Sequence, residues 1–123
     1  MIKLYVAGPY NSNDVMGVAL NMHHGIKVST EMRRHGFAVY CPWDDFLEAL
    51  FAPDIPIDHW RESSLEHLRS SQVMLIVDIL PNWNKSVGTM GEISEAIDLK
   101  LPFFYYSAVA NLLRWRDMYE GRT

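Results

Sequence analysis

Four short apolar runs divide the chain at fairly even intervals. The most apolar covers residues 73–77, Val-Met-Leu-Ile-Val, with three β-branched members, as expected for a strand buried on both faces. The others are also rich in β-branched or aromatic residues. Strands are therefore expected at residues 3–7, 37–40, 73–77 and 101–106.

Longer segments with apolar residues at helical spacing separate these runs. The first is preceded by Asn13 and Asp14, either of which can cap a helix, and Gly36 follows it as a stop signal. Residues 43–57 contain proline and have no clear period, which indicates a long loop or a short helix near 46–51. Helices are expected at 15–34, 57–69 and 109–119, with another opening within 86–93.

Strands alternating with helices predict an α/β fold with a parallel sheet. We expect one domain over residues 1–123, built as a Rossmann-like or flavodoxin-like three-layer sandwich with four to five strands and helices on both faces. Ligands of such sheets bind beyond the carboxyl ends of the strands, near the switch in strand order.

Polar and glycine-rich segments follow several of the predicted strands at that edge. They are the loop from Gly8 to Asn13, Asp44 and Asp45, Asp78, and the segment from Ser86 to Glu92. Glycines beside hydroxyl groups at a helix start can present free backbone N–H groups to an anion. Glu92, about one turn further on, would lie close to that anion. The alternative is a carboxylate that only interacts with the helix dipole.

Composition narrows the class of protein. Hydrophobic residues make up 49% of the chain, which excludes disorder, and no apolar run approaches a membrane span. The net charge of −4 argues against a partner that is a nucleic-acid polymer. Cys41 is the lone cysteine, and the amino terminus lacks the layout of a signal peptide, so a cytoplasmic location is expected.

Two segments resemble the nucleoside 2-deoxyribosyltransferase-like superfamily. Residues 4–10, Leu-Tyr-Val-Ala-Gly-Pro-Tyr, are similar to its opening, and residues 80–92, Leu-Pro-Asn-Trp-Asn-Lys-Ser-Val-Gly-Thr-Met-Gly-Glu, to a later motif followed by Glu95-Ala96. Within that group the chain most resembles small uncharacterised bacterial and phage proteins. The resemblance extends nearly to Pro102 and depends on the order and spacing of the motifs.

The resemblance implies a role for particular side chains. Glu92 matches the nucleophile that attacks the anomeric carbon of a nucleoside and holds the sugar as an ester, and Tyr5 matches the tyrosine that orients that carboxylate. Ser86 and Gly88 match the phosphate-binding positions of the nucleotide N-glycosidase branch. The loop that encloses base and sugar corresponds to Gly8, Pro9, Tyr10, Asn11 and Ser12.

One position departs from the family pattern. The family usually has an aspartate on the second helix to protonate or hold the base, and this chain has Ser64 there. A serine supplies no proton at neutral pH, so another acid would be needed. Asp78, Asp58 or a substrate that leaves unaided are the alternatives.

The remaining candidates have structural alternatives. Trp83 is either a base-stacking lid or a loop anchor, and Asp44 is a substrate-binding candidate at the sheet edge. The histidines lack metal-ligand spacing and no G-x-G-x-x-G run is present, so neither a metal nor a cofactor is expected.

Three functions remain open from the sequence. They are an enzyme that cleaves or transfers the N-glycosidic bond of a nucleoside or nucleotide, a nucleotide-binding module that has lost catalysis, and an interaction protein. The family's pockets are completed by a neighbouring subunit, so a homo-oligomer is expected, with Trp115, Tyr119 and Phe51 as surface aromatics available for it.

Overall fold

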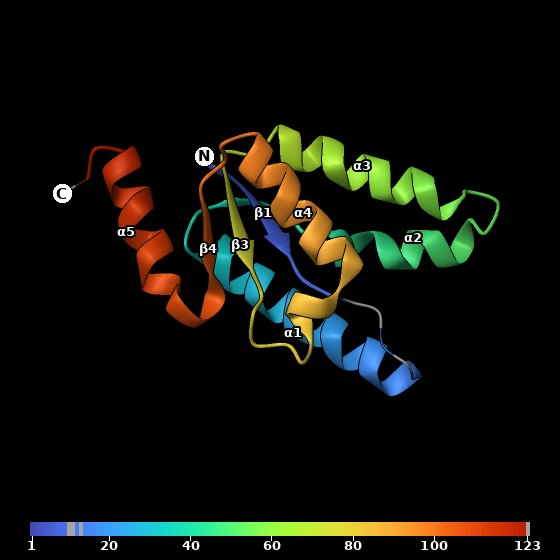
Figure 1. Ribbon diagram of the computed structural model, residues 1–123. Helices are drawn as coiled ribbons and strands as arrows, with labels where there is room; N and C mark the ends of the chain where they lie inside the picture. The colour runs from blue at the N-terminus through green and yellow to red at the C-terminus, as the bar shows by residue number, and fades with distance from the viewer. Residues whose placement is uncertain (10–11, 13, 123) are drawn as a thin grey trace.

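The computed structural model is an α/β fold around a four-stranded, all-parallel sheet, as the alternation of strands and helices predicted (Figure 1). The structure describes residues 1–9, 12 and 14–122. The strand order is β2-β1-β3-β4, which is the Rossmann-like or flavodoxin-like arrangement. The strands are β1 (Lys3–Ala7), β2 (Ala38–Tyr40), β3 (Val73–Ile76) and β4 (Phe103–Tyr105).

Helices connect the strands and cover both faces of the sheet. The predicted helices over 15–34, 57–69 and 109–119 are confirmed, and the proline-containing segment after β2 forms two short helices rather than an open loop. The α-helices are α1 (Val15–Arg34), α2 (Phe46–Phe51), α3 (Ile57–Arg69), α4 (Val87–Asp98) and α5 (Val109–Tyr119). Short 3-10 helices are η1 (Pro42–Asp45), η2 (Trp83–Lys85) and η3 (Tyr106–Ala108).

Local signals set the ends of α1. The Asp14 carboxylate accepts a hydrogen bond of 2.6 Å from the Gly17 amide, which satisfies one of the free N–H groups at the helix start. The other predicted cap, Asn13, lies outside the described residues. Gly36 follows the helix with a φ of 89°, a left-handed conformation that glycine adopts without a steric penalty.

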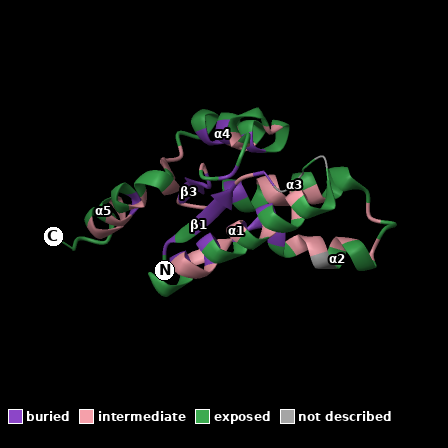
Figure 2. Cartoon of the chain, turned by 90° about the horizontal axis from the view of Figure 1, so that it is seen from below, coloured by how far each residue is buried: buried purple, intermediate pink, exposed green. Residues whose placement is uncertain are grey.

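Alternate residues of β1 enter two separate hydrophobic cores. Leu4 and Val6 pack with residues of α1 and α5 on one face, whereas Tyr5 and Ala7 pack with residues of α3 and α4 on the other. Figure 2 shows α1 and α4 on opposite sides of the purple, buried strands. The sheet is therefore the middle layer of three, and each face of β1 has its own partners.

The order of the strands places the switch point between β1 and β3. From β1 the chain proceeds to β2 on one side, and from β3 it proceeds to β4 on the other. The loops that follow β1 and β3 thus lie at the position where ligands of this fold class bind. Among the described residues, no helix is long and apolar enough to cross a membrane.

Candidate active site

Tyr5 and Glu92 face each other between the sheet and α4. Tyr5 is fully buried in the middle of β1, and the Glu92 carboxyl lies in the second turn of α4 with its Oε2 atom buried. Neither Tyr5 Oη nor Glu92 Oε2 has a hydrogen bond of good geometry with another described residue. The two groups are nevertheless close enough that each shifts the pKa of the other. The fold therefore places next to each other the two side chains that the resemblance singled out as nucleophile and orienting tyrosine.

Burial controls the protonation of this pair. Removal from water raises the pKa of Glu92 to about 8, and the Tyr5 hydroxyl partly opposes that rise. Burial and then the Glu92 carboxylate hold the pKa of Tyr5 well above its usual range. At neutral pH, Glu92 is consequently mostly protonated and Tyr5 is a neutral hydroxyl. Glu92 must lose a proton before its oxygen can act as a nucleophile.

Ser64 lies beside the same tyrosine. Its hydroxyl is near enough to Tyr5 to lower the pKa of that phenol, and it is 3.5 Å from the Tyr40 Oη. Tyr40 is the register partner of Tyr5 in the sheet, and their ring centroids are 5.5 Å apart. The position where the resembled family has an aspartate therefore does face the site, with a hydroxyl in place of a carboxyl.

Asp45 belongs to this group although the sequence analysis did not assign it a role. The Tyr40 hydroxyl donates a hydrogen bond of 2.5 Å to Asp45 Oδ2, and the Tyr40 ring stacks on His67 with centroids 3.9 Å apart. Burial, followed by the hydrogen bond to Asp45, raises the pKa of Tyr40. Tyr40 stands at the carboxyl end of β2, the strand that pairs with β1. This position was the sequence signal that could have pointed to Asp45.

Ser86 acts as the N-cap of α4. Its Oγ accepts a hydrogen bond of 3.3 Å from the Thr89 amide and one of 3.1 Å from the Thr89 hydroxyl. Gly88 is exposed in the first turn. Among the described residues, the amides of Val87 and Gly88 have no hydrogen-bond partner, so the helix start presents donors to the solvent. The predicted phosphate site thus has donors, and its serine already has a structural role.

The loop after β1 begins in close contact with the rest of the fold. A Cβ atom on Gly8 would lie 2.8 Å from Trp43 Cη2, so the indole allows only glycine to approach it this closely. Pro9 is buried, and Ser12 is exposed. The predicted substrate contacts of Tyr10 and Asn11 fall on positions outside the described residues.

Asp78 and Asp58, the two acids that could replace the missing aspartate, do not lie at the Tyr5–Glu92 pair. Asp78 follows β3 and accepts hydrogen bonds from the Ser107 amide, at 2.9 Å, and from the Ser107 hydroxyl, which connects the ends of β3 and β4. Asp58 is 90% exposed on α3. Neither carboxylate contributes to the pKa shifts of Tyr5 and Glu92. The structure therefore brings neither of them to the Tyr5–Glu92 pair.

Two predicted substrate-binding residues contact other parts of the protein. Asp44 pairs with Arg33 at 3.3 Å and is half-exposed. Trp83 lies half-buried against the core of the α3–α4 face, with its ring centroid 5.7 Å from that of Tyr105. This contact fits the loop-anchor interpretation of Trp83, because the indole packs at the rim of the sheet.

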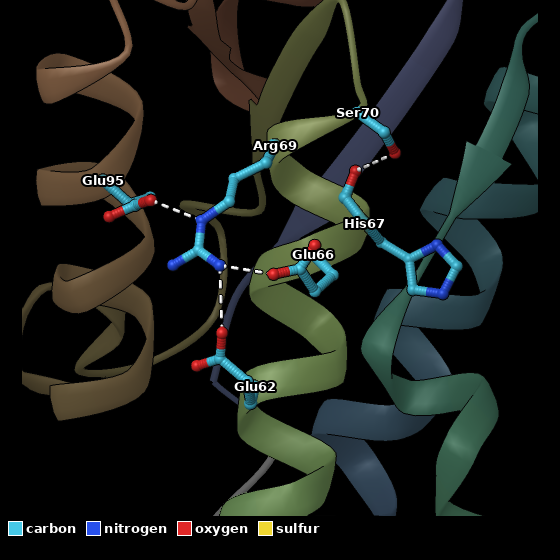
Figure 3. A network of polar contacts seen from close by, with 6 residues as sticks. All are labelled: Glu62, Glu66, His67, Arg69, Ser70 and Glu95. Carbon is cyan, nitrogen blue, oxygen red and sulfur yellow. Dashed lines mark hydrogen bonds and ion pairs between the residues drawn. The ribbon is translucent and has the colours of Figure 1, made fainter.

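The helices that carry Ser64 and Glu92 are joined by one guanidinium group. Arg69 of α3 donates to Glu95 of α4 at 2.8 Å and also contacts Glu62 and Glu66 of its own helix (Figure 3). These pairs are exposed, so each adds little free energy of folding. The Arg69–Glu95 pair links α3 to α4, the two helices that carry Ser64 and Glu92.

Two surface grooves lie away from the Tyr5–Glu92 pair. Grooves of about 460 Å³ and 330 Å³ run along α3, and neither is lined by Tyr5 or Glu92. The larger one is a trough on the outer side of α3, whereas the smaller one runs between α3 and the edge strand β2. We place the candidate site at the Tyr5–Glu92 pair, because buried polar atoms without partners are more informative about chemistry than an open trough.

Fold and site together define a class: a parallel α/β protein with a buried carboxyl–hydroxyl pair beside its switch point. In comparisons with known proteins, no family model matches the chain and no curated protein matches its sequence. The resemblance to the deoxyribosyltransferase-like superfamily therefore contributes only to the proposal that follows.

Proposed function

We propose that the chain cleaves or transfers the N-glycosidic bond of a nucleoside or a nucleoside 5′-monophosphate. The observation that carries the proposal is the buried Glu92 carboxyl, whose Oε2 has no partner among the described residues and which faces the Tyr5 hydroxyl. A buried acid with a free oxygen at a helix start beside the switch point has the environment of a reacting group. The sequence resemblance supports the same assignment.

The proposed reaction has two displacements. The ionised Glu92 oxygen attacks the anomeric carbon, the bond to the base nitrogen breaks, and the base leaves with the bonding electron pair and takes up a proton from the solvent. Water or a second base then attacks the same carbon, breaks the ester and restores the Glu92 carboxylate. Tyr5 donates a hydrogen bond that orients the carboxylate between the two steps.

The 5′-phosphate is assigned to the start of α4. The free amides of Val87 and Gly88 and the positive end of the helix dipole favour an anion there. A 5′-monophosphate should therefore bind more tightly than the corresponding nucleoside. Equal affinities in a calorimetric titration would remove the phosphate from the proposal and leave Ser86 as a cap only.

The second candidate is a nucleotide-binding module without catalysis. Ser64 favours it, because a hydroxyl in place of a carboxyl leaves the departing base without the family's proton donor. A thermal-shift screen with nucleosides and monophosphates detects binding in either case, since a ligand at 100 times its Kd stabilises by about 2.7 kcal/mol. Chromatography of free base then separates catalysis from binding.

Substitution of the proposed nucleophile tests the mechanism directly. Glu92→Gln should abolish base release, by about a thousand-fold or more, while ligand binding persists, because the amide keeps the shape of the side chain but forms no glycosyl ester. Tyr5→Phe should slow the reaction more mildly. Turnover retained in purified Glu92→Gln protein contradicts the mechanism, and absence of turnover in the unaltered chain favours the binding module, for which Ser64→Asp is the restoring substitution.

A homo-oligomer, at least a dimer, is part of the proposal. Phe51 is 87% exposed at the end of α2 and Tyr119 is 55% exposed at the end of α5, where it stacks on Trp115. Exposed aromatic side chains are enriched at interfaces between subunits. Light scattering at micromolar concentration should give at least twice the monomer mass, and a monomer mass rejects this part.

A further inference from the structure

Three hydroxyl-bearing side chains lie in succession between the buried carboxyl of Glu92 and a second carboxyl. Tyr5 faces Glu92, Ser64 lies between Tyr5 and Tyr40, and Tyr40 donates to Asp45 at 2.5 Å. Each member comes from a different element: α4, β1, α3, β2 and η1. A path drawn from five elements depends on the tertiary fold and not on local sequence.

We propose that Asp45 exchanges a proton with Glu92 through the hydroxyl groups of Tyr5, Ser64 and Tyr40. The assignment of this exchange to nucleophile activation rests on the proposed function. Asp45 then holds, at the far end of the path, the proton that Glu92 gives up.

A count of protons shows that the path works in both directions. With Glu92 protonated and Asp45 ionised, four links join the five groups and four protons are available, one for each link. If every proton moves one link toward Asp45, Glu92 becomes a carboxylate and Asp45 a carboxylic acid. No proton is gained or lost, and every link again holds one. The ionised Glu92 is the form that attacks the sugar.

The links differ in strength. The Tyr40–Asp45 hydrogen bond, at 2.5 Å, has the short length typical of a charged acceptor. The Tyr40–Ser64 distance of 3.5 Å is longer than a strong O–H···O hydrogen bond, and Tyr5 Oη has no hydrogen bond of good geometry among the described residues. The path is therefore well formed between Tyr40 and Asp45 and open at the two links made by Tyr5, and these two links must close when the proton moves.

Other titratable groups border the path. The His67 ring of α3 stacks on Tyr40, and the Cys41 thiol, which adjoins Tyr40 in the chain, is buried with its pKa raised to about 12 by that burial. Asp44 is directed to Arg33 on the outside. The thiol therefore stays protonated in the pH range of the experiment.

Carbon-13 nuclear magnetic resonance of carboxyl carbons tests the path without a substrate. Coupled groups titrate together, so the Asp45 Cγ resonance of the intact protein should show a second step at the pH where Glu92 Cδ titrates. Glu92→Gln should remove that step. Tyr40→Phe should also remove it while Glu92 itself still titrates, because the variant keeps both charges and breaks only the path.

Matched variants separate the path from general effects of substitution. Tyr106 donates to Glu31 at 2.5 Å on the opposite face of the sheet, so Tyr106→Phe deletes an equivalent bond and should leave the Asp45 step intact. Ser64→Ala should abolish the step, and Ser64→Thr, which keeps a hydroxyl, should preserve it. This pair also provides the test if Tyr40→Phe does not fold.

The outcomes distinguish this inference from the proposed function. An Asp45 resonance without a step, or a step that survives Tyr40→Phe or Ser64→Ala, overturns the path whether or not base is released. If the Asp45 resonance shows the second step and the variants lose it as predicted, the path is supported even if no nucleotide is cleaved. In that case only the proposed reaction fails. Where turnover exists, Tyr40→Phe, Asp45→Asn and the double variant should lower kcat by the same factor with KM unchanged, since all break one path.

Discussion

The two faces of the sheet differ in their buried polar groups although the same strands build both. The face covered by α1 and α5 is packed mainly with aliphatic and aromatic side chains, and its unpartnered polar atoms, Ser29 Oγ and Trp43 Nε1, belong to groups that stay neutral. The face covered by α3 and α4 also has a hydrophobic cluster, but it holds the hydroxyl of Tyr5 and the carboxyl of Glu92. Neighbouring residues of β1 thus serve different purposes.

This difference shows how a small domain accommodates buried polar chemistry. The free energy lost by burying a carboxyl on one face has to be offset by apolar burial elsewhere. Here the opposite face of the same sheet supplies that burial. Substitutions on the two faces should therefore change different properties of the protein, stability on one and protonation or activity on the other.

The largest effect is expected from Leu4→Ala. Leu4 is fully buried on the α1–α5 face, and truncation should lower the free energy of unfolding by about 2–5 kcal/mol. Tyr5→Phe, at the next position, removes only a hydroxyl that has no well-formed hydrogen bond. It should change the free energy of unfolding by less than about 1 kcal/mol. Urea unfolding measures both, and similar losses would contradict the contrast between the faces.

Glu92 should make stability fall as the pH rises. Its pKa is raised from 4.5 to about 8 in the folded protein, so between these values the folded state binds more protons than the unfolded state. The contribution of Glu92 to the free energy of unfolding is largest below about pH 4.5. It declines between there and about pH 8, by as much as roughly 1.4 kcal/mol per pH unit. Glu92→Gln should lose this decline and be more stable than the unaltered protein at pH 9. Parallel pH profiles for the two proteins would exclude a buried, protonated Glu92.

Two helical glycines provide a smaller contrast between the faces. A Cβ atom on Gly25 of α1 would lie 2.6 Å from Trp43 Cδ2, so Gly25→Ala should destabilise by about 1–3 kcal/mol through overpacking. Gly91 of α4 has nothing within 4 Å of that position, and Gly91→Ala should stabilise by about 0.5–1 kcal/mol through helix propensity. Thermal unfolding of the pair should shift in opposite directions; a shift of the same sign would show that Trp43 yields easily.

Ser86→Ala should have a small effect on stability. Loss of the cap on α4 is expected to lower the free energy of unfolding by about 1 kcal/mol. Ser94→Ala, at an exposed position within the same helix, is the control. It should change the free energy of unfolding by less than half of the loss expected for Ser86→Ala. Binding of a 5′-monophosphate to Ser86→Ala, measured by calorimetry, separates the two proposed roles: weaker binding supports the anion site, and unchanged binding restricts Ser86 to capping.

Much of the fold could be predicted because its signals are local. The apolar run after Gln72 and the helical spacing around Val18 and Met22 depend only on neighbours along the chain. The bounds of α5 were predicted as observed, whereas β2 and β4 are shorter than their apolar runs, because pairing with a partner strand and not hydrophobicity sets where a strand ends.

The site was only partly predictable. Tyr5 and Glu92 lie in the segments that carry the resemblance and were predicted as site residues, but their burial and their effect on each other's pKa arise from packing of α4 on β1. Asp45 was placed at the sheet edge without a role, since its contact with Tyr40 depends on how η1 turns after β2. Asp78 follows a strand like a ligand-binding carboxylate, yet its oxygens accept hydrogen bonds from Ser107, 29 residues further along the chain.

The two edge strands restrict how copies of the protein can associate. Both β2 and β4 contain three residues, with Pro42 opening the helix just after β2 and Pro102 directly before β4. Edges this short, next to residues that cannot donate a backbone hydrogen bond, offer a poor template for adding another strand. Association is thereby directed to helix surfaces, which form interfaces of limited size, and open-ended growth of the sheet into fibrils is disfavoured.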